Sequence, residues 1–164
     1  MQRESHYAAG IVVFRNGAEG RRYLILRSAL TRRPVWEFPK GGVEVGESER
    51  EAAERELGEE TGLGSEEYSM VDGFREEEQY VFTGGRGGVR RLISKRVVYF
   101  LAEAHTERVR ISHEATEFRW LDYEEAQQVL RFPQKRRVLD LAEEWLNGSD
   151  EGEREGEGES AGSR

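Results

Sequence analysis

Residues 41–63 read GGVEVGESEREAAERELGEETGL, and this stretch decides how the rest of the chain is interpreted. Ser48 and Glu51 have the spacing of a capping box, in which each side chain binds the other residue's backbone at the start of a helix. The residues that follow are mostly good helix formers, and Gly62 lies where a left-handed glycine commonly ends a helix. We therefore predict a glycine-rich loop that leads into a helix of about three turns.

The predicted helix carries three glutamates, Glu56, Glu59 and Glu60, at positions i, i+3 and i+4. At about 100° per residue they share one face, and Ala52, one turn earlier, leaves the approach to them open. Such a cluster repels itself unless cations neutralise it, and carboxylates without cysteine suit Mg²⁺ or Mn²⁺ better than Zn²⁺. Because the chain is rich in glutamate, the spacing alone leaves a solvent-exposed acidic face as the alternative.

The same stretch also matches a longer pattern at every fixed position. From Gly41 to Leu63 the sequence fits Gly-x5-Glu-x7-Arg-Glu-aliphatic-x-Glu-Glu-x-Gly-aliphatic, the box of the Nudix hydrolases, which the chain therefore resembles. The resemblance implies an α/β fold, an α/β/α sandwich with a mixed β-sheet. It also implies a metal-dependent pyrophosphohydrolase that acts on a nucleoside diphosphate linked to another group.

The resemblance assigns roles within the box. Arg55 corresponds to an orienting arginine, and one glutamate that is not fully used as a ligand, Glu59 or Glu60, accepts the proton of the attacking water. Outside the box, Glu114 resembles an additional glutamate near the metals, with a surface-loop glutamate as the alternative. The implied metal-binding residues are Gly41, Glu47, Glu56, Glu59 and Glu60.

Three stretches resemble the asymmetrical diadenosine tetraphosphate hydrolases: WEFPKGGVEVGES (36–48), SKRVVYFLAE (94–103) and SHEATEFRWLDYEEA (112–126). They imply hydrolysis of diadenosine tetraphosphate to ATP and AMP. Diphosphoinositol polyphosphates, dNTPs and nucleotide sugars stay open as substrates, because related enzymes share the Pro-Lys-Gly before the box. A Nudix-fold binding module that no longer hydrolyses is disfavoured by the three intact glutamates of the box.

Four residues are candidates for substrate binding. Lys40 and Lys95 are two of only three lysines in the chain, and we assign both to phosphate oxygens. A solvated lysine is the alternative for each. Tyr80 and Phe132 are candidates for stacking on adenine, with core packing as the alternative.

The remaining elements are predicted from apolar patterns and turns. Asp122 with Glu125 repeats the capping-box spacing for a short helix. Apolar residues from Val138 to Trp145 recur at helical spacing, which predicts a C-terminal amphipathic helix. Strands are predicted at residues 8–14, 23–27, 35–38, 68–82, 90–104 and 117–121.

Composition limits the classes of function. The chain has 164 residues; we predict one Nudix domain at residues 1–146 and a disordered acidic tail, rich in Gly and Glu, at residues 147–164. The formal net charge of −8 argues against general nucleic-acid binding, and the lack of cysteine excludes a thiolate metal site or nucleophile. No apolar run suggests a membrane span or a signal peptide, so we expect a cytoplasmic protein. We also expect it to act as a monomer or homodimer on a small nucleotide substrate.

Overall fold

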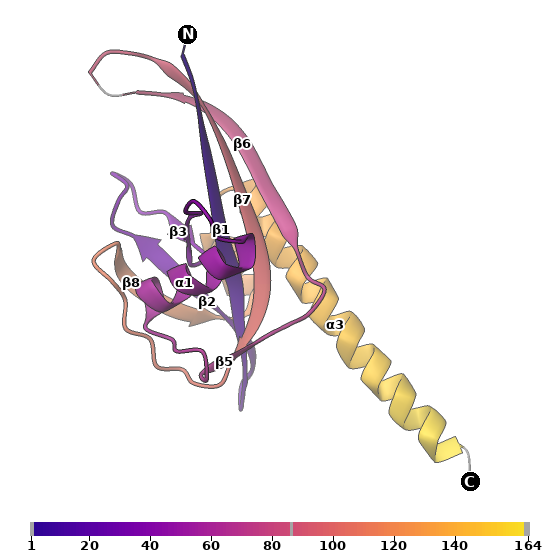
Figure 1. The fold of residues 1–164 in the computed structure, drawn as a ribbon. Helices are drawn as coiled ribbons and strands as arrows, with labels where there is room; N and C mark the ends of the chain where they lie inside the picture. Colours follow the sequence, from indigo (N-terminus) through magenta and orange to yellow (C-terminus); the bar gives the residue numbers. More distant parts are fainter. Residues whose placement is uncertain (1, 86, 163–164) are drawn as a thin grey trace.

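The computed structural model describes residues 2–85 and 87–162, with side chains described as far as residue 149. Figure 1 shows α1 and α3 on opposite sides of a sheet that is built around two long strands, β1 and β7. In chain order the elements are β1 (Gln2–Gly17), β2 (Gly20–Ser28), β3 (Trp36–Glu37), β4 (Lys40–Gly42), α1 (Glu49–Thr61), β5 (Tyr68–Met70), β6 (Glu76–Gly84), β7 (Arg91–Ala104), β8 (Ala115–Leu121), α2 (Tyr123–Val129) and α3 (Pro133–Gly162).

The sheet is mixed, as the sequence predicts. β1 and β7 run parallel at its centre, with residues 2–14 of β1 paired to residues 91–103 of β7. β2 and β4 are antiparallel to β1, β5 and β6 are antiparallel to β7, and β3 and β8 are antiparallel to β2. The central pair therefore places residues from the two halves of the chain side by side.

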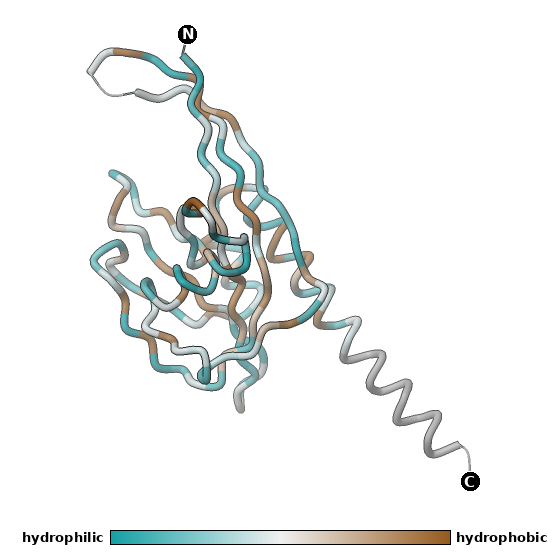
Figure 2. Tube along the Cα trace, in the orientation of Figure 1, coloured by the Kyte–Doolittle hydropathy of each residue, from teal (hydrophilic) through white to brown (hydrophobic). Residues whose placement is uncertain are grey.

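Each face of the sheet is covered by helices. Alternate residues of a strand point to opposite faces, so Ile11 and Val13 of β1 pack with Leu57 of α1, whereas Val12 packs in the cluster that contains Leu139 of α3. Figure 2 shows hydrophobic stretches along the central strands and at the start of α3, while most loops are hydrophilic. The predicted α/β/α sandwich is confirmed.

One predicted strand, at residues 68–82, is wrong in extent. The structure divides it into β5 and β6, with a turn at Asp72 and Gly73 between them. Gly73 has a φ of 91°, a conformation that glycine adopts at no steric cost. Both strands pair with β7, so the chain bends without leaving its neighbour. The Asp-Gly turn thus outweighs the strand propensity of the residues around it.

The other predicted strands are confirmed with shifted ends, and the capping box of Asp122 and Glu125 is present at the start of α2. The largest shift is in β1, which begins at Gln2 instead of residue 8. Its first residues are polar and carry no strand pattern. They are extended because β7 supplies a parallel hydrogen-bonding partner along their whole length.

α3 differs most from its prediction. Its first half packs as expected, because Val138 and Leu146 are buried and Trp145 contacts Phe74 edge-on with ring centroids 6.0 Å apart. Residues 147–162, predicted as a disordered tail, continue this helix and project away from the body (Figure 1). The domain boundary at residue 146 stays a prediction.

Within the described residues, no helix is both long and apolar enough to cross a membrane.

Candidate active site

α1 presents its glutamates from a helix with two defined ends. Ser48 is the N-cap, and its side chain accepts a hydrogen bond from the backbone N–H of Glu51 at 3.0 Å. Gly62 ends the helix with a φ of 73°, and its N–H donates to the carbonyl of Gly58 at 3.0 Å. Leu57 anchors the apolar side of the helix in the core, so the acidic side is turned towards the preceding loop and the cleft.

Arg55 joins that loop to the helix. Its guanidinium donates to both carboxylate oxygens of Glu47, at 2.7 and 2.9 Å, and to the carbonyl of Gly42 at 2.8 Å. It also donates to Glu56 at 2.9 Å and to Glu59 at 3.4 Å. These hydrogen bonds, led by those to Glu47, raise the pKa of Arg55, and the same pairing lowers the pKa of the Glu47 carboxyl. One side chain thus holds the loop against the helix.

Glu56 lies directly against the backbone of Gly41. A Cβ atom at position 41 would be 2.0 Å from the Cδ of Glu56, so only glycine leaves room for this carboxylate. Burial is the main effect that raises the pKa of Glu56, and Arg55 opposes it. The neighbouring carboxylates of Glu59 and Glu114 reinforce the rise. Additional positive charge beside Glu56 would therefore stabilise its ionised form.

Glu60 lies where α1 meets β4. Its Oε2 accepts a hydrogen bond from the backbone N–H of Lys40 at 3.0 Å. Burial raises the pKa of Glu60 to about 8; the hydrogen bond from Lys40 offsets only part of the lost hydration, and the charge of Glu56 adds to the rise. A nearby cation would favour the ionised form of this carboxylate.

The chemistry of these residues fits a divalent cation. Glu56 and Glu60 have raised pKa values that added positive charge would lower, and carboxylate and carbonyl oxygens are the ligands that Mg²⁺ and Mn²⁺ prefer. As placed, no group of three or more His, Asp or Glu side chains in the described part of the chain is arranged to hold a metal ion. The guanidinium of Arg55 lies among three of the carboxylates instead. Metal binding by the five box residues stays a prediction.

Lys40 and Lys95 lie next to each other on β4 and β7. The Nζ of Lys40 is 3.7 Å from the Glu37 carboxylate. Burial opposes the charge of Lys40, but Glu37 and, more weakly, Glu60 help to outweigh burial and raise its pKa. Burial and the neighbouring charge of Lys40 lower the pKa of Lys95 to about 8. An anion beside the two ammonium groups would stabilise both of them, as a phosphate site requires.

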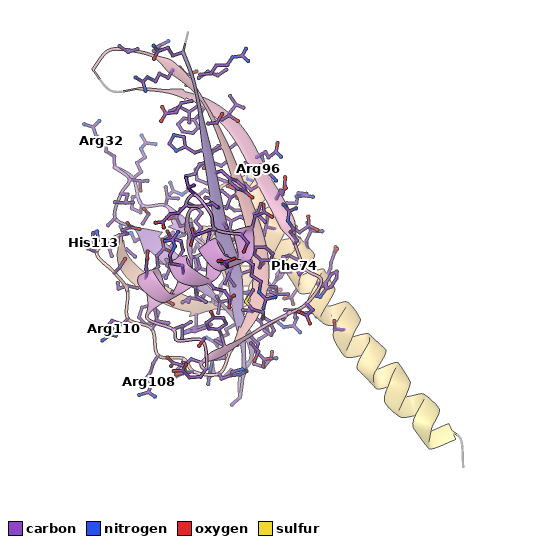
Figure 3. All side chains as sticks on the ribbon, viewed as in Figure 1. Arg32, Phe74, Arg96, Arg108, Arg110 and His113 are labelled. Carbon is purple, nitrogen blue, oxygen red and sulfur yellow. The ribbon has the colours of Figure 1, made fainter. Side chains whose placement is uncertain are left out.

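A cleft of about 420 Å³ brings the two lysines together with Glu60 and Glu114. The carboxylate of Glu37 and the start of β1, with Tyr7, line the same cleft, and sequence reasoning missed both. The alternation of Glu37 with the buried Phe38 was an available signal, whereas β1 reaches the cleft only through its pairing with β7. His113, next to Glu114, lies at the edge of the molecule on the loop before β8 (Figure 3).

Tyr80 and Phe132 do not line the cleft that contains Glu60 and lie near each other. Tyr80, on β6, stacks on Phe82 with ring centroids 5.9 Å apart, and Phe132, just before α3, is 49% exposed. Both rings line a second cavity of about 190 Å³ between β6 and the start of α3. Neither ring belongs to the two hydrophobic clusters of the core.

Comparison with known proteins establishes the family. The family model of the NUDIX domain matches residues 4–142, so the chain belongs to the Nudix family. The intact box and the related hydrolases make it a metal-dependent Nudix hydrolase, as the sequence predicts.

Two curated relatives and one solved structure illustrate the similarity. The chain is 36% identical over 113 residues to the asymmetrical bis(5′-nucleosyl)-tetraphosphatase of Mus musculus, which covers 68% of this chain and 71% of the mouse protein. It is 34% identical over 125 residues to the RNA pyrophosphohydrolase of Halorhodospira halophila, covering 70% of this chain and 67% of that protein. The structure of the C. elegans Ap4A hydrolase binary complex superposes with a TM-score of 0.76 and 28% identity, over 87% of this chain and 98% of that one.

Proposed function

We propose that this Nudix hydrolase cleaves diadenosine polyphosphates and converts diadenosine tetraphosphate to ATP and AMP. The observation that carries the proposal is a row of neighbouring residues that leads from the box to the separate aromatic cavity. The row consists of Glu60, Lys40, Lys95, Tyr80 and Phe132. The similarity to the mouse tetraphosphatase and to the C. elegans Ap4A hydrolase supports the same substrate.

Each part of the row has its own chemical task. Lys40 and Lys95 bind phosphate oxygens and hold the polyphosphate in one register. Tyr80 and Phe132 stack on one adenine, an interaction worth about 1 to 3 kcal/mol per base. The cavity between the two rings, and their place outside the core, favour stacking over core packing. A polyphosphate that binds in one register is cleaved at one phosphoanhydride bond.

The proposed cofactor is Mg²⁺ or Mn²⁺, held by the box glutamates and the carbonyl of Gly41. Bound there, the cation would neutralise the polyphosphate and lower the pKa of the attacking water. Glu59 or Glu60 accepts the proton of that water, and Glu114 completes the acidic wall of the cleft. Arg55 keeps the loop in position for this chemistry. We expect the protein to act in the cytoplasm as a monomer or homodimer.

Product analysis tests the proposal. With diadenosine tetraphosphate and Mg²⁺, ATP and AMP should appear in equal amounts. In ¹⁸O-labelled water the label should enter AMP only, because attack occurs at the phosphorus that bears the departing adenosine. Two molecules of ADP as the main product would refute the proposal.

Competing substrates define the alternative. A diphosphoinositol polyphosphate, a dNTP and a 5′-triphosphorylated RNA belong in the same assay, the RNA because of the similarity to an RNA pyrophosphohydrolase. Much faster turnover of one of them would identify that compound, instead of diadenosine tetraphosphate, as the substrate. The Nudix chemistry would be unchanged.

A further inference from the structure

A buried ion pair forms the floor of the cavity between Tyr80 and Phe132. The Nζ of Lys135 lies 2.9 Å from the Oε1 of Glu78, and the two side chains are 4% and 1% exposed. Both residues line the cavity. Removing two charges from water is so unfavourable that an apolar pair of similar size is often at least as stable. Stability alone therefore does not explain why charged residues are found here.

The pair leaves one hydrogen-bond acceptor unused. The Oε2 of Glu78 is buried and has no hydrogen-bond partner. A buried polar atom of this kind is unfavourable unless a ligand or a water donates to it. The terminal torsion of a glutamate side chain is broad, so a modest rotation can turn Oε2 to the cavity while Oε1 stays with Lys135.

The ammonium group of the pair lies between the two aromatic rings. The Nζ of Lys135 is 5.1 Å from the ring centroid of Phe132 and 5.7 Å from that of Tyr80. A planar group that enters between the rings would therefore meet a donor and an acceptor at its inner edge. The volume of about 190 Å³ compares with about 150 Å³ for an engineered cavity that holds benzene.

The walls of the cavity are fixed relative to each other. The side-chain amide of Gln134, at the start of α3, accepts a hydrogen bond from the backbone N–H of Gln79 at 2.7 Å and donates to the carbonyl of the same residue. Arg137, one turn further along α3, donates to the carbonyl of Glu77 at 3.3 Å. These contacts fasten the start of α3 to the outer edge of β6, so the cavity keeps its width.

We propose that Glu78 and Lys135 recognise the Watson–Crick edge of the purine that stacks between Tyr80 and Phe132, and that they favour adenine through its 6-amino group. The 6-amino group donates to Glu78, and Lys135 donates to the adjacent N1. The inference rests on the proposed binding of a nucleotide base at this cavity and adds a specificity-determining contact to it.

Equilibrium binding tests this recognition without catalysis. ATP and purine riboside 5′-triphosphate differ only in the 6-amino group, and both are titrated calorimetrically with EDTA present so that neither is hydrolysed. The wild-type protein should bind ATP about 10- to 100-fold more tightly, as expected for one hydrogen bond to a charged group. Equal affinity for the two would overturn the inference. Neither ligand needs to be a substrate, so this result is separate from the fate of diadenosine tetraphosphate in the turnover assay.

A pair of double variants separates recognition from packing. Glu78→Leu with Lys135→Met removes both charges at similar volume and should remain folded in circular dichroism. It should lose affinity for ATP but not for purine riboside 5′-triphosphate, so that the ratio of the two binding affinities falls to near 1. If this variant does not fold, the comparison of the two ligands on the wild-type protein still decides whether the 6-amino group is recognised.

The control is Glu117→Leu with Arg119→Met. This ion pair on β8 is 2.7 Å apart, is more exposed than Glu78 and Lys135, and does not line the cavity. Its ratio should stay at the wild-type value. A wild-type ratio in the Glu78/Lys135 variant, or an equal loss in the control, would overturn the inference.

Discussion

Replacing Gly41 by alanine should abolish turnover and leave the fold intact, whereas Gly42→Ala should change neither. The two glycines are neighbours on β4 and differ in what a side chain would meet. A Cβ at position 41 would lie 2.0 Å from the Cδ of Glu56, whereas a Cβ at position 42 would meet nothing within 4 Å. Ordinary contact begins at 3.4 Å, so the Glu56 carboxylate would have to retreat by about 1.4 Å.

The expected size of the effect follows from that displacement. A misplacement of about 1 Å in a catalytic arrangement can lower the rate by about 100-fold, so Gly41→Ala should lose at least that factor in kcat. The clash falls on a side chain that is 12% exposed, and crowding of this kind destabilises a protein by about 1 to 3 kcal/mol. The variant should therefore be folded and inactive at room temperature.

Three measurements check this reasoning. Turnover of diadenosine tetraphosphate gives the loss of activity, and thermal unfolding followed by circular dichroism shows that the variant is folded. Titration with Mn²⁺, followed by the electron paramagnetic resonance of the free ion, reports the site directly and should show weakened binding in Gly41→Ala only. If Gly41→Ala matched Gly42→Ala in turnover and in Mn²⁺ affinity, the role given to the space beside Gly41 would be wrong.

Further outcomes follow from the same site. Glu59→Gln or Glu60→Gln should lower turnover by orders of magnitude without unfolding, because each removes a carboxylate from a self-repelling cluster; unchanged turnover would contradict the metal assignment. At saturating Mg²⁺, which would keep the Glu60 carboxylate ionised, kcat/KM should fall as the pH rises through about 8, where Lys95 loses its proton and its attraction for phosphate, and Lys95→Arg should remove this decline; a flat wild-type profile under these conditions would count against the phosphate role. Because the pKa of Lys95 is lowered from 10.5 to about 8, the unfolded chain holds more protons at Lys95 between these values, so the free energy of unfolding of the wild type should rise with pH there relative to that of Lys95→Met, as urea titrations of the two proteins can measure. Truncation after Asn147, which still accepts a hydrogen bond from Arg21 at 2.9 Å, should leave turnover and thermal midpoint nearly unchanged, and a large fall in either would show that the removed helix contacts the body.

The helix of the box could be predicted because its signals are local. Ser48 caps the backbone three residues ahead, and Gly62 ends the helix by its own backbone conformation. The spacing of Glu56, Glu59 and Glu60 then follows from helical geometry alone. The start of β1 depends instead on pairing with β7, which no local pattern encodes, whereas the bend at Gly73 has a local signal in its Asp-Gly pair.

The aromatic cavity shows the limit of sequence reasoning more sharply. Tyr80 and Phe132 could be chosen as single candidates because an exposed planar side chain suits a base. The partnership of Glu78 with Lys135 spans 57 residues and depends on how the start of α3 docks on β6. In the sequence Glu78 is one of three successive glutamates, and only the fold distinguishes the buried one from its neighbours.

Gly10 explains how Lys40 can lie between Glu60 of α1 and Lys95 of β7. Gly10 of β1 pairs with Lys40 of β4, and a Cβ at this position would lie 2.5 Å from the carbonyl oxygen of Pro39 and 2.7 Å from the Cβ of Lys40. β4 can therefore approach β1 this closely only at a glycine. At this point the backbone N–H of Lys40 donates a hydrogen bond to Glu60, while the ammonium group of Lys40 lies beside that of Lys95. In the proposed binding mode, the sheet itself thus sets the distance between the glutamates that hold the cation and the lysines that hold phosphate, which is the rigid support that a single cleavage position requires.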